Sequence, residues 1–83
     1  MDRAGEIEAA ILRLLAGRRD GATICPSEVA RAVEPGNWRA LMPEVRAGAT
    51  AMAAQGRLRI TQKGCPVDPE TARGPVRLAL PRD

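Results

Sequence analysis

The chain of 83 residues contains no histidine, tyrosine or phenylalanine, and its only aromatic residue is Trp38. Without histidine, neither a Ser-His-Asp nor a Cys-His catalytic arrangement can form. Two cysteines fall short of the ligand sets that hold structural zinc, and no glycine-rich phosphate-binding motif is present. The carboxylates are scattered, without the paired spacing typical of acid–base catalysis. We therefore expect a protein that is not an enzyme and uses neither a cofactor nor a metal.

Long apolar runs are also missing. No stretch approaches the roughly 20 apolar residues that cross a membrane, and the N-terminus does not have the composition of a secretory signal peptide. These features predict a cytoplasmic protein with no membrane partner and no small-molecule ligand. The length is enough for one domain with a modest core, in which alanine fills much of the interior. We expect a single domain over residues 1–83.

The net charge of +3 lies at the C-terminal end of the chain. Residues 1–56 carry seven basic and seven acidic side chains, whereas residues 57–83 carry six basic and three acidic ones. A basic segment of this kind suits contact with a nucleic acid. The alternative is a coding bias, because the chain has twelve arginines and fifteen alanines but a single lysine.

Apolar residues recur with helical spacing over residues 6–16 and again over residues 43–55. The first segment predicts a helix that ends at Gly17. The second predicts the helix around which the chain is organised, with Pro43 at its first position and Gly56 as its stop.

A further helix is predicted to start at Pro26, which makes Cys25 its N-cap. Glu28 is then placed to accept a hydrogen bond from the Cys25 amide, as in half of a capping box. Ile24 and Val29 are placed to pack over this cap as a hydrophobic staple.

Residues 38–41 are expected to form a separate short turn, because Pro43 disfavours helical geometry at Met42. Trp38 lies in this turn. We interpret it as a lid over the core, with stacking on a nucleobase as the alternative.

After Gly56 the apolar period changes from 3.6 to 2, which predicts an antiparallel hairpin of residues 57–63 and 75–80. The alternation predicts these inward side chains: Leu58, Ile60, Val76, Leu78 and Leu80. The intervening wing loop, residues 64–74, is long, and Asp68-Pro69 predicts a single helical turn within it. The predicted order of elements is a helix, a stub of strand at residues 23–24, two helices and a hairpin. This order is typical of an α+β winged helix-turn-helix with three main helices and a short wing.

Three segments carry a family resemblance: CPSEVAR at 25–31, WRALMP at 38–43 and QKGCPVDPETARGPVRL at 62–78. Together they resemble the bacterial domain-of-unknown-function family 3253. The resemblance covers nearly the whole chain and implies a winged-helix fold of the DNA-binding kind. It implies no established activity and no functional residues.

Binding of duplex DNA is the function that we expect from this fold and charge. The outward face of the predicted third helix is mostly alanine and offers few groups that can distinguish base pairs. Phosphate contacts from the helix and the wing are easier to supply, so we expect weak binding that is largely independent of sequence. The predicted nucleic-acid-binding residues are Arg46, Thr50, Lys63, Arg73 and Arg77, of which Arg77 is expected on the outer face of the hairpin with Arg57 and Arg59.

A protein–protein interaction or dimerisation module is the alternative. Ala47, Ala51 and Ala54 fall on one side of the predicted third helix, where small side chains allow another helix to approach closely. The partner would then be a second copy of this chain or another protein.

Cys25 has two interpretations of its own. A thiol at a helix N-terminus can have a lowered pKa and become reactive, although the negative charge of Glu28 opposes this effect. We favour the simpler interpretation of a half-buried cap residue. A disulfide between Cys25 and Cys65 is conceivable but would be unusual in the cytoplasm.

Overall fold

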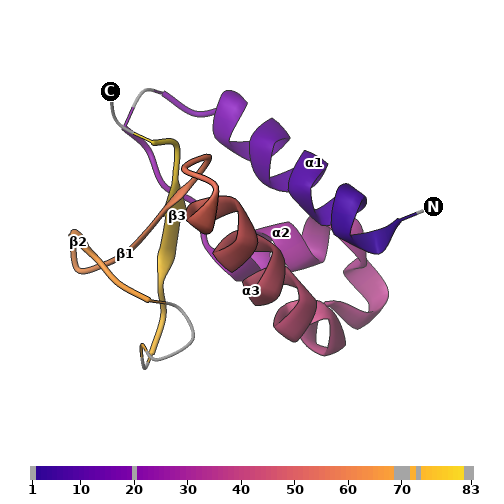
Figure 1. The fold of residues 1–83 in the computed structure, drawn as a ribbon. Coiled ribbons are helices and arrows are strands. Elements are labelled where there is room, and N and C mark those ends of the chain that lie inside the picture. Colours follow the sequence, from indigo (N-terminus) through magenta and orange to yellow (C-terminus); the bar gives the residue numbers. More distant parts are fainter. Residues whose placement is uncertain (1, 20, 69–71, 73, 82–83) are drawn as a thin grey trace.

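The computed structural model describes residues 2–19, 21–68, 72 and 74–81 (Figure 1). Three helices come first along the chain: α1 (Arg3–Ala16), α2 (Pro26–Val33) and α3 (Trp38–Ala54), with a short 3-10 turn η1 (Pro35–Asn37) between the last two. The strands follow: β1 (Arg59–Gln62), β2 (Cys65–Pro66) and β3 (Arg77–Ala79). They form an antiparallel sheet in the order β2-β1-β3. No helix of the described residues is both long and apolar enough to cross a membrane.

Helix α1 begins three residues earlier than the apolar pattern predicts. The side chain of Asp2 accepts a hydrogen bond from the Ala4 amide at 3.1 Å and so caps a first turn that carries no apolar signal. The rest of α1 follows the prediction closely, because the helix ends at Gly17 and buries Ile7, Ala10, Ile11 and Leu15 of the predicted core-facing stripe. The fifth member of that stripe, Leu14, is only half-buried.

Helix α2 begins as predicted. Cys25 is its N-cap and Pro26 its first residue, and the Cys25 amide donates to Glu28 Oε1 at 3.1 Å. Ile24 and Val29, the predicted staple, are both fully buried. Ile24 also forms a bridge to Leu78 of β3 through two backbone hydrogen bonds of 2.9 and 2.8 Å, which confirms the stub of strand.

The prediction of a separate turn before Pro43 is wrong, since α3 runs without a break from Trp38 to Ala54 with Pro43 inside it. Proline in a helix removes one backbone hydrogen bond. Here Leu41 and Val45, on either side of Pro43, are both buried in the same core. We infer that this packing outweighs the local cost, so the buried stripe passes through the proline.

The sheet confirms the predicted antiparallel pairing, with Ile60 opposite Leu78. Leu58, Ile60, Val76 and Leu78 are buried as predicted, but Leu80 lies beyond the end of β3 and is 44% exposed. The predicted wing loop contains β2, which pairs with β1 around a tight turn at Lys63 and Gly64. Both turn residues have positive φ, 53° and 82°, as a type I′ turn requires. The predicted helical turn falls on residues 69–71, outside the described residues.

Candidate nucleic-acid interface

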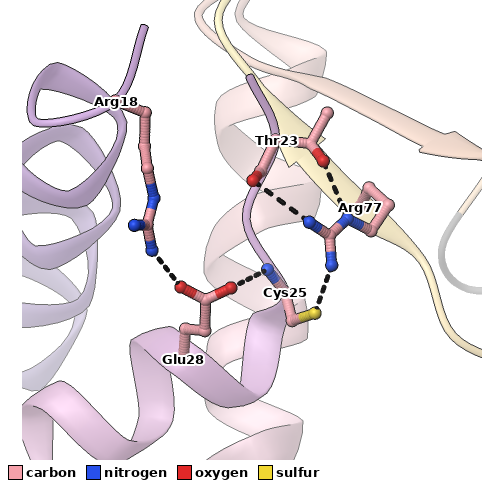
Figure 2. Close-up of polar contacts among 5 residues, drawn as sticks. All are labelled: Arg18, Thr23, Cys25, Glu28 and Arg77. Atoms are coloured by element: carbon pink, nitrogen blue, oxygen red, sulfur yellow. Dashed lines mark hydrogen bonds and ion pairs between the residues drawn. The ribbon is translucent and has the colours of Figure 1, made fainter.

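The guanidinium group of Arg77 is half-buried and hydrogen-bonded to Thr23 and Cys25 (Figure 2). It donates to Thr23 Oγ1 at 2.7 Å and to the Thr23 carbonyl at 3.2 Å, and its third contact is the sulfur of Cys25. These bonds tie β3 to the stub of strand and to the cap of α2. Three of the five N–H donors of Arg77 are thus used within the domain, and its role in DNA binding stays a prediction.

Cys25 occupies the centre of this network. Its amide is held by Glu28, whose other carboxylate oxygen pairs with Arg18 from the end of α1 (Figure 2). The thiol is half-buried against Arg77, and both Cys25 and Cys65 are free, so the conceivable disulfide is not formed. The geometry agrees with the interpretation of Cys25 as a cap residue.

Unlike Arg77, three arginines on the side of the domain around α1 form ion pairs with carboxylates. Arg18 pairs with Glu28, Arg57 with Glu8, and Arg3 with both Glu34 at 3.4 Å and Glu6 at 3.9 Å. The hydrogen bond from Arg57 lowers the pKa of Glu8, and its positive charge acts in the same direction. Arg59 makes a different internal contact, from its Nε to the Leu80 carbonyl at 2.9 Å.

Arginines on α2 and α3 are arranged differently. Within the described part of the chain, no carboxylate pairs with Arg31, Arg39 or Arg46. The guanidinium carbon of Arg31 lies over the ring of Trp38, 4.3 Å from its centroid, and that of Arg39 lies 4.9 Å from it. Trp38 also packs against the core, which confirms its interpretation as a lid. We call Arg31, Trp38 and Arg39 the α2–α3 corner.

The predicted binding residues occupy several parts of the fold. Arg46 is half-buried on α3, and the hydroxyl of Thr50 donates to the Arg46 carbonyl at 2.8 Å. Lys63 is exposed at the β1–β2 turn, whereas Arg73 is outside the described residues. The prediction omitted Arg31 and Arg39, although Arg39 directly follows the only aromatic residue of the chain. The position of Arg39 next to Trp38 was the one feature of the sequence that could have indicated these two residues as binding candidates.

Among residues 2–19, 21–68, 72 and 74–81, no three His, Cys, Asp or Glu side chains are grouped so as to hold a metal ion. What the fold does present is a set of cations on two helices and a hairpin tip.

Three helices followed by a small antiparallel sheet, with its β1–β2 hairpin extending from the helices, define an α+β winged-helix arrangement. The family described as "Protein of unknown function (DUF3253)" matches residues 4–81, nearly the whole chain. The chain therefore belongs to this family, as the sequence motifs indicated. No curated protein matches it.

Proposed function

We propose that this domain binds duplex DNA weakly, through phosphate contacts and with little dependence on sequence. The observation that carries the proposal is the presence, on α3 and the wing, of cations that no described carboxylate neutralises, among them Arg46 and Lys63. In winged helices these two elements can approach one duplex together. Arg73, in the wing loop, is proposed as a third contact.

The composition of α3 supports the lack of sequence preference. Reading a base pair takes side chains with several donors or acceptors, and bidentate pairs of this kind give roughly 1–3 kcal/mol of discrimination each. The exposed positions of α3 include Ala40, Ala47, Ala51 and Ala54. Thr50 already uses its hydroxyl hydrogen within the helix. Phosphate contact therefore remains the principal source of affinity.

A fluorescence polarisation titration with mixed-sequence duplex DNA at two salt concentrations tests this proposal. Three phosphate contacts give a log–log salt slope of about −2.7, so raising the salt from about 50 to 200 mM weakens binding roughly 40-fold. Replacing Lys63 and Arg73 together by alanine should flatten the slope by about two units for every sequence alike. Tight binding to one sequence that survives high salt would contradict the proposal.

One observation favours a second candidate, docking of a protein through the alanine side of α3. An apolar hollow between α1 and α3 is lined by Ala4, Ile7, Glu44, Ala47, Gly48 and Ala51. A stable dimer with no polarisation shift on DNA addition would support this alternative. Sedimentation of the free protein over a range of concentrations provides that measurement.

A further inference from the structure

We propose that the α2–α3 corner, extended along α3 by Arg46, is the main phosphate-binding surface of the domain. This inference rests on the proposed function and assigns most of the contacts to the helices rather than to the wing. The ligand is the phosphodiester backbone of duplex DNA. Four observations carry it: the closeness of the two guanidinium groups, the lack of paired carboxylates, the position of Trp38 and the alignment of Arg39 with Arg46.

The two guanidinium groups of the corner repel each other. Since their carbons lie 4.3 and 4.9 Å from the same ring centroid, the two carbons cannot be more than 9.2 Å apart. This upper limit slightly exceeds the Debye length of about 8 Å at physiological salt, so the repulsion is partly screened and is stronger the closer the two groups lie within that limit. No described carboxylate pairs with either group. A phosphate that contacts both groups from the solvent side would relieve the repulsion, which is a reason for the site to bind an anion.

Trp38 prepares the corner for such a ligand. An exposed arginine side chain normally loses rotamer freedom when it binds, and this loss weakens the contact. Stacking on the ring restricts Arg31 and Arg39 in advance, and it leaves the N–H groups at the edges of the guanidinium planes available as donors. Because Trp38 also packs against the core, its own position is fixed.

Backbone contact fits the corner better than base stacking does. Both guanidinium groups already lie over the Trp38 ring, and the side chain packs on the core. A nucleobase would therefore have to displace a guanidinium group in order to stack there. We accordingly assign the corner to the phosphates of duplex DNA, and we expect single-stranded DNA to gain nothing from Trp38.

Arg46 continues the surface along α3. It follows Arg39 by seven residues, which places both on one side of the helix about 10 Å apart along its axis. The wing, in comparison, has few free cations in the described residues, since Arg57, Arg59 and Arg77 all bind partners within the chain and only Lys63 remains. Of these three arginines, only Arg57 is neutralised, by Glu8, whereas Arg59 and Arg77 keep their charge but use N–H donors on neutral acceptors within the domain.

The test compares two charge-matched double variants by polarisation with duplex DNA over a range of salt. Arg31→Gln/Arg39→Gln removes the corner, and Arg13→Gln/Arg19→Gln removes two exposed charges from α1 and the loop after it. With Arg31, Arg39, Arg46, Lys63 and Arg73 all in contact, the wild-type slope is about −4.5 and binding weakens roughly 500-fold from 50 to 200 mM salt. The corner variant should show a slope of about −2.7, and the control variant should keep the wild-type slope.

Arg31→Lys/Arg39→Lys completes the design, because it keeps both charges and should keep most of the slope. All replaced residues are exposed, and circular dichroism verifies that each variant is folded. A slope near −2.7 in both the wild type and the corner variant overturns this inference and leaves the proposed function intact. No polarisation shift at any salt overturns both. Tighter binding to the single strand than to the duplex overturns the assignment to the duplex backbone.

Discussion

Arginines in two regions of this small domain have opposite environments. Around α1, the side chains of Arg3, Arg18 and Arg57 each pair with a glutamate from another part of the chain, whereas Arg13 and Arg19 have no carboxylate partner among the described residues. At the α2–α3 corner, Arg31 and Arg39 share one tryptophan ring and have no paired carboxylate among the described residues. Three arginines of the first region are therefore engaged in ion pairs within the domain, whereas the two of the corner stack on one ring and keep N–H donors free for a ligand.

The contrast shows why a count of charges along the sequence is a poor guide to a binding surface. The count places the whole excess of positive charge after residue 56. In the structure, three of the arginines there are bound within the domain, whereas the segment of zero net charge contains the unpaired corner. What a ligand can contact depends on which guanidinium groups are left free by intramolecular ion pairs and hydrogen bonds, and a count along the sequence does not contain that information.

Reversing the charge of the corner should have the largest effect. Each phosphate contact contributes roughly a 15-fold gain in affinity at 50 mM salt, so losing two weakens binding by roughly 100-fold or more. We expect this loss in Arg31→Glu/Arg39→Glu, measured by polarisation with duplex DNA. In Arg18→Gln/Arg57→Gln, which removes two paired arginines, affinity should change by no more than about threefold. Equal losses in the two variants would erase the distinction between the regions.

Replacing Arg77 should have the next largest effect, and the quantity that changes is the stability of the domain rather than its affinity for DNA. Arg77→Met removes three contacts of a partly buried cation and should lower the free energy of unfolding by about 1–3 kcal/mol. Urea denaturation measures this value. The salt slope of DNA binding should stay the same, since the guanidinium is used inside the domain. A flatter slope with unchanged stability would return Arg77 to the binding surface.

Cys25→Ser should have a smaller effect, because serine is the better N-cap and the Glu28 contact is to the backbone amide. We expect a cost of about 1 kcal/mol or less and no change in DNA binding. Thiol labelling at pH 7 provides the complementary test, in a Cys65→Ser background because Cys65 is exposed. Labelling of the native protein faster than that of a free thiol would favour the reactive interpretation of Cys25.

The smallest effect concerns the pair of Glu8 and Arg57. The pKa of Glu8 is lowered in the folded state by the hydrogen bond from Arg57. The stabilisation is therefore present above the ordinary pKa of glutamate, about 4.3, and is lost as the pH falls through the lowered value. An NMR titration should find the Glu8 midpoint below the ordinary value, and in Arg57→Gln it should return towards it. An ordinary midpoint in the wild type would show that the pair does not persist in solution.

Sequence periodicity was sufficient to predict most of the architecture. The change from a period of 3.6 to 2 after Gly56 located β1 and β3 and their inward side chains, and cap chemistry located the start of α2. Periodicity did not predict β2, which lies within the segment expected to be a loop. The failures occurred where long-range packing outweighs a local rule. Pro43 was expected to interrupt the helix, but buried residues on both sides of it hold α3 together. Leu80 was expected to face the core because it continues the apolar alternation, but β3 ends at Ala79 and Leu80 lies beyond it.

The candidate site was less predictable than the fold. Arg46 and Lys63 could be selected because each lies on an element whose position follows from the element order. Arg31 and Trp38 are seven residues apart on different helices, so their contact depends on how α2 and α3 meet around η1. The hydrogen bonds of Arg77 likewise depend on the bridge between Ile24 and Leu78, because that bridge brings Thr23 and Cys25 next to β3.

Trp38 itself provides the most direct test of where DNA binds. It is the only aromatic residue of the chain, so the intrinsic fluorescence of the protein reports on the α2–α3 corner alone. Quenching by acrylamide, a neutral molecule, measures the accessibility of Trp38 before and after saturation with duplex DNA in wild-type protein. Our account predicts that the quenching constant falls on saturation and recovers when high salt releases the DNA. An unchanged quenching constant, with polarisation showing that the protein is saturated, would contradict it.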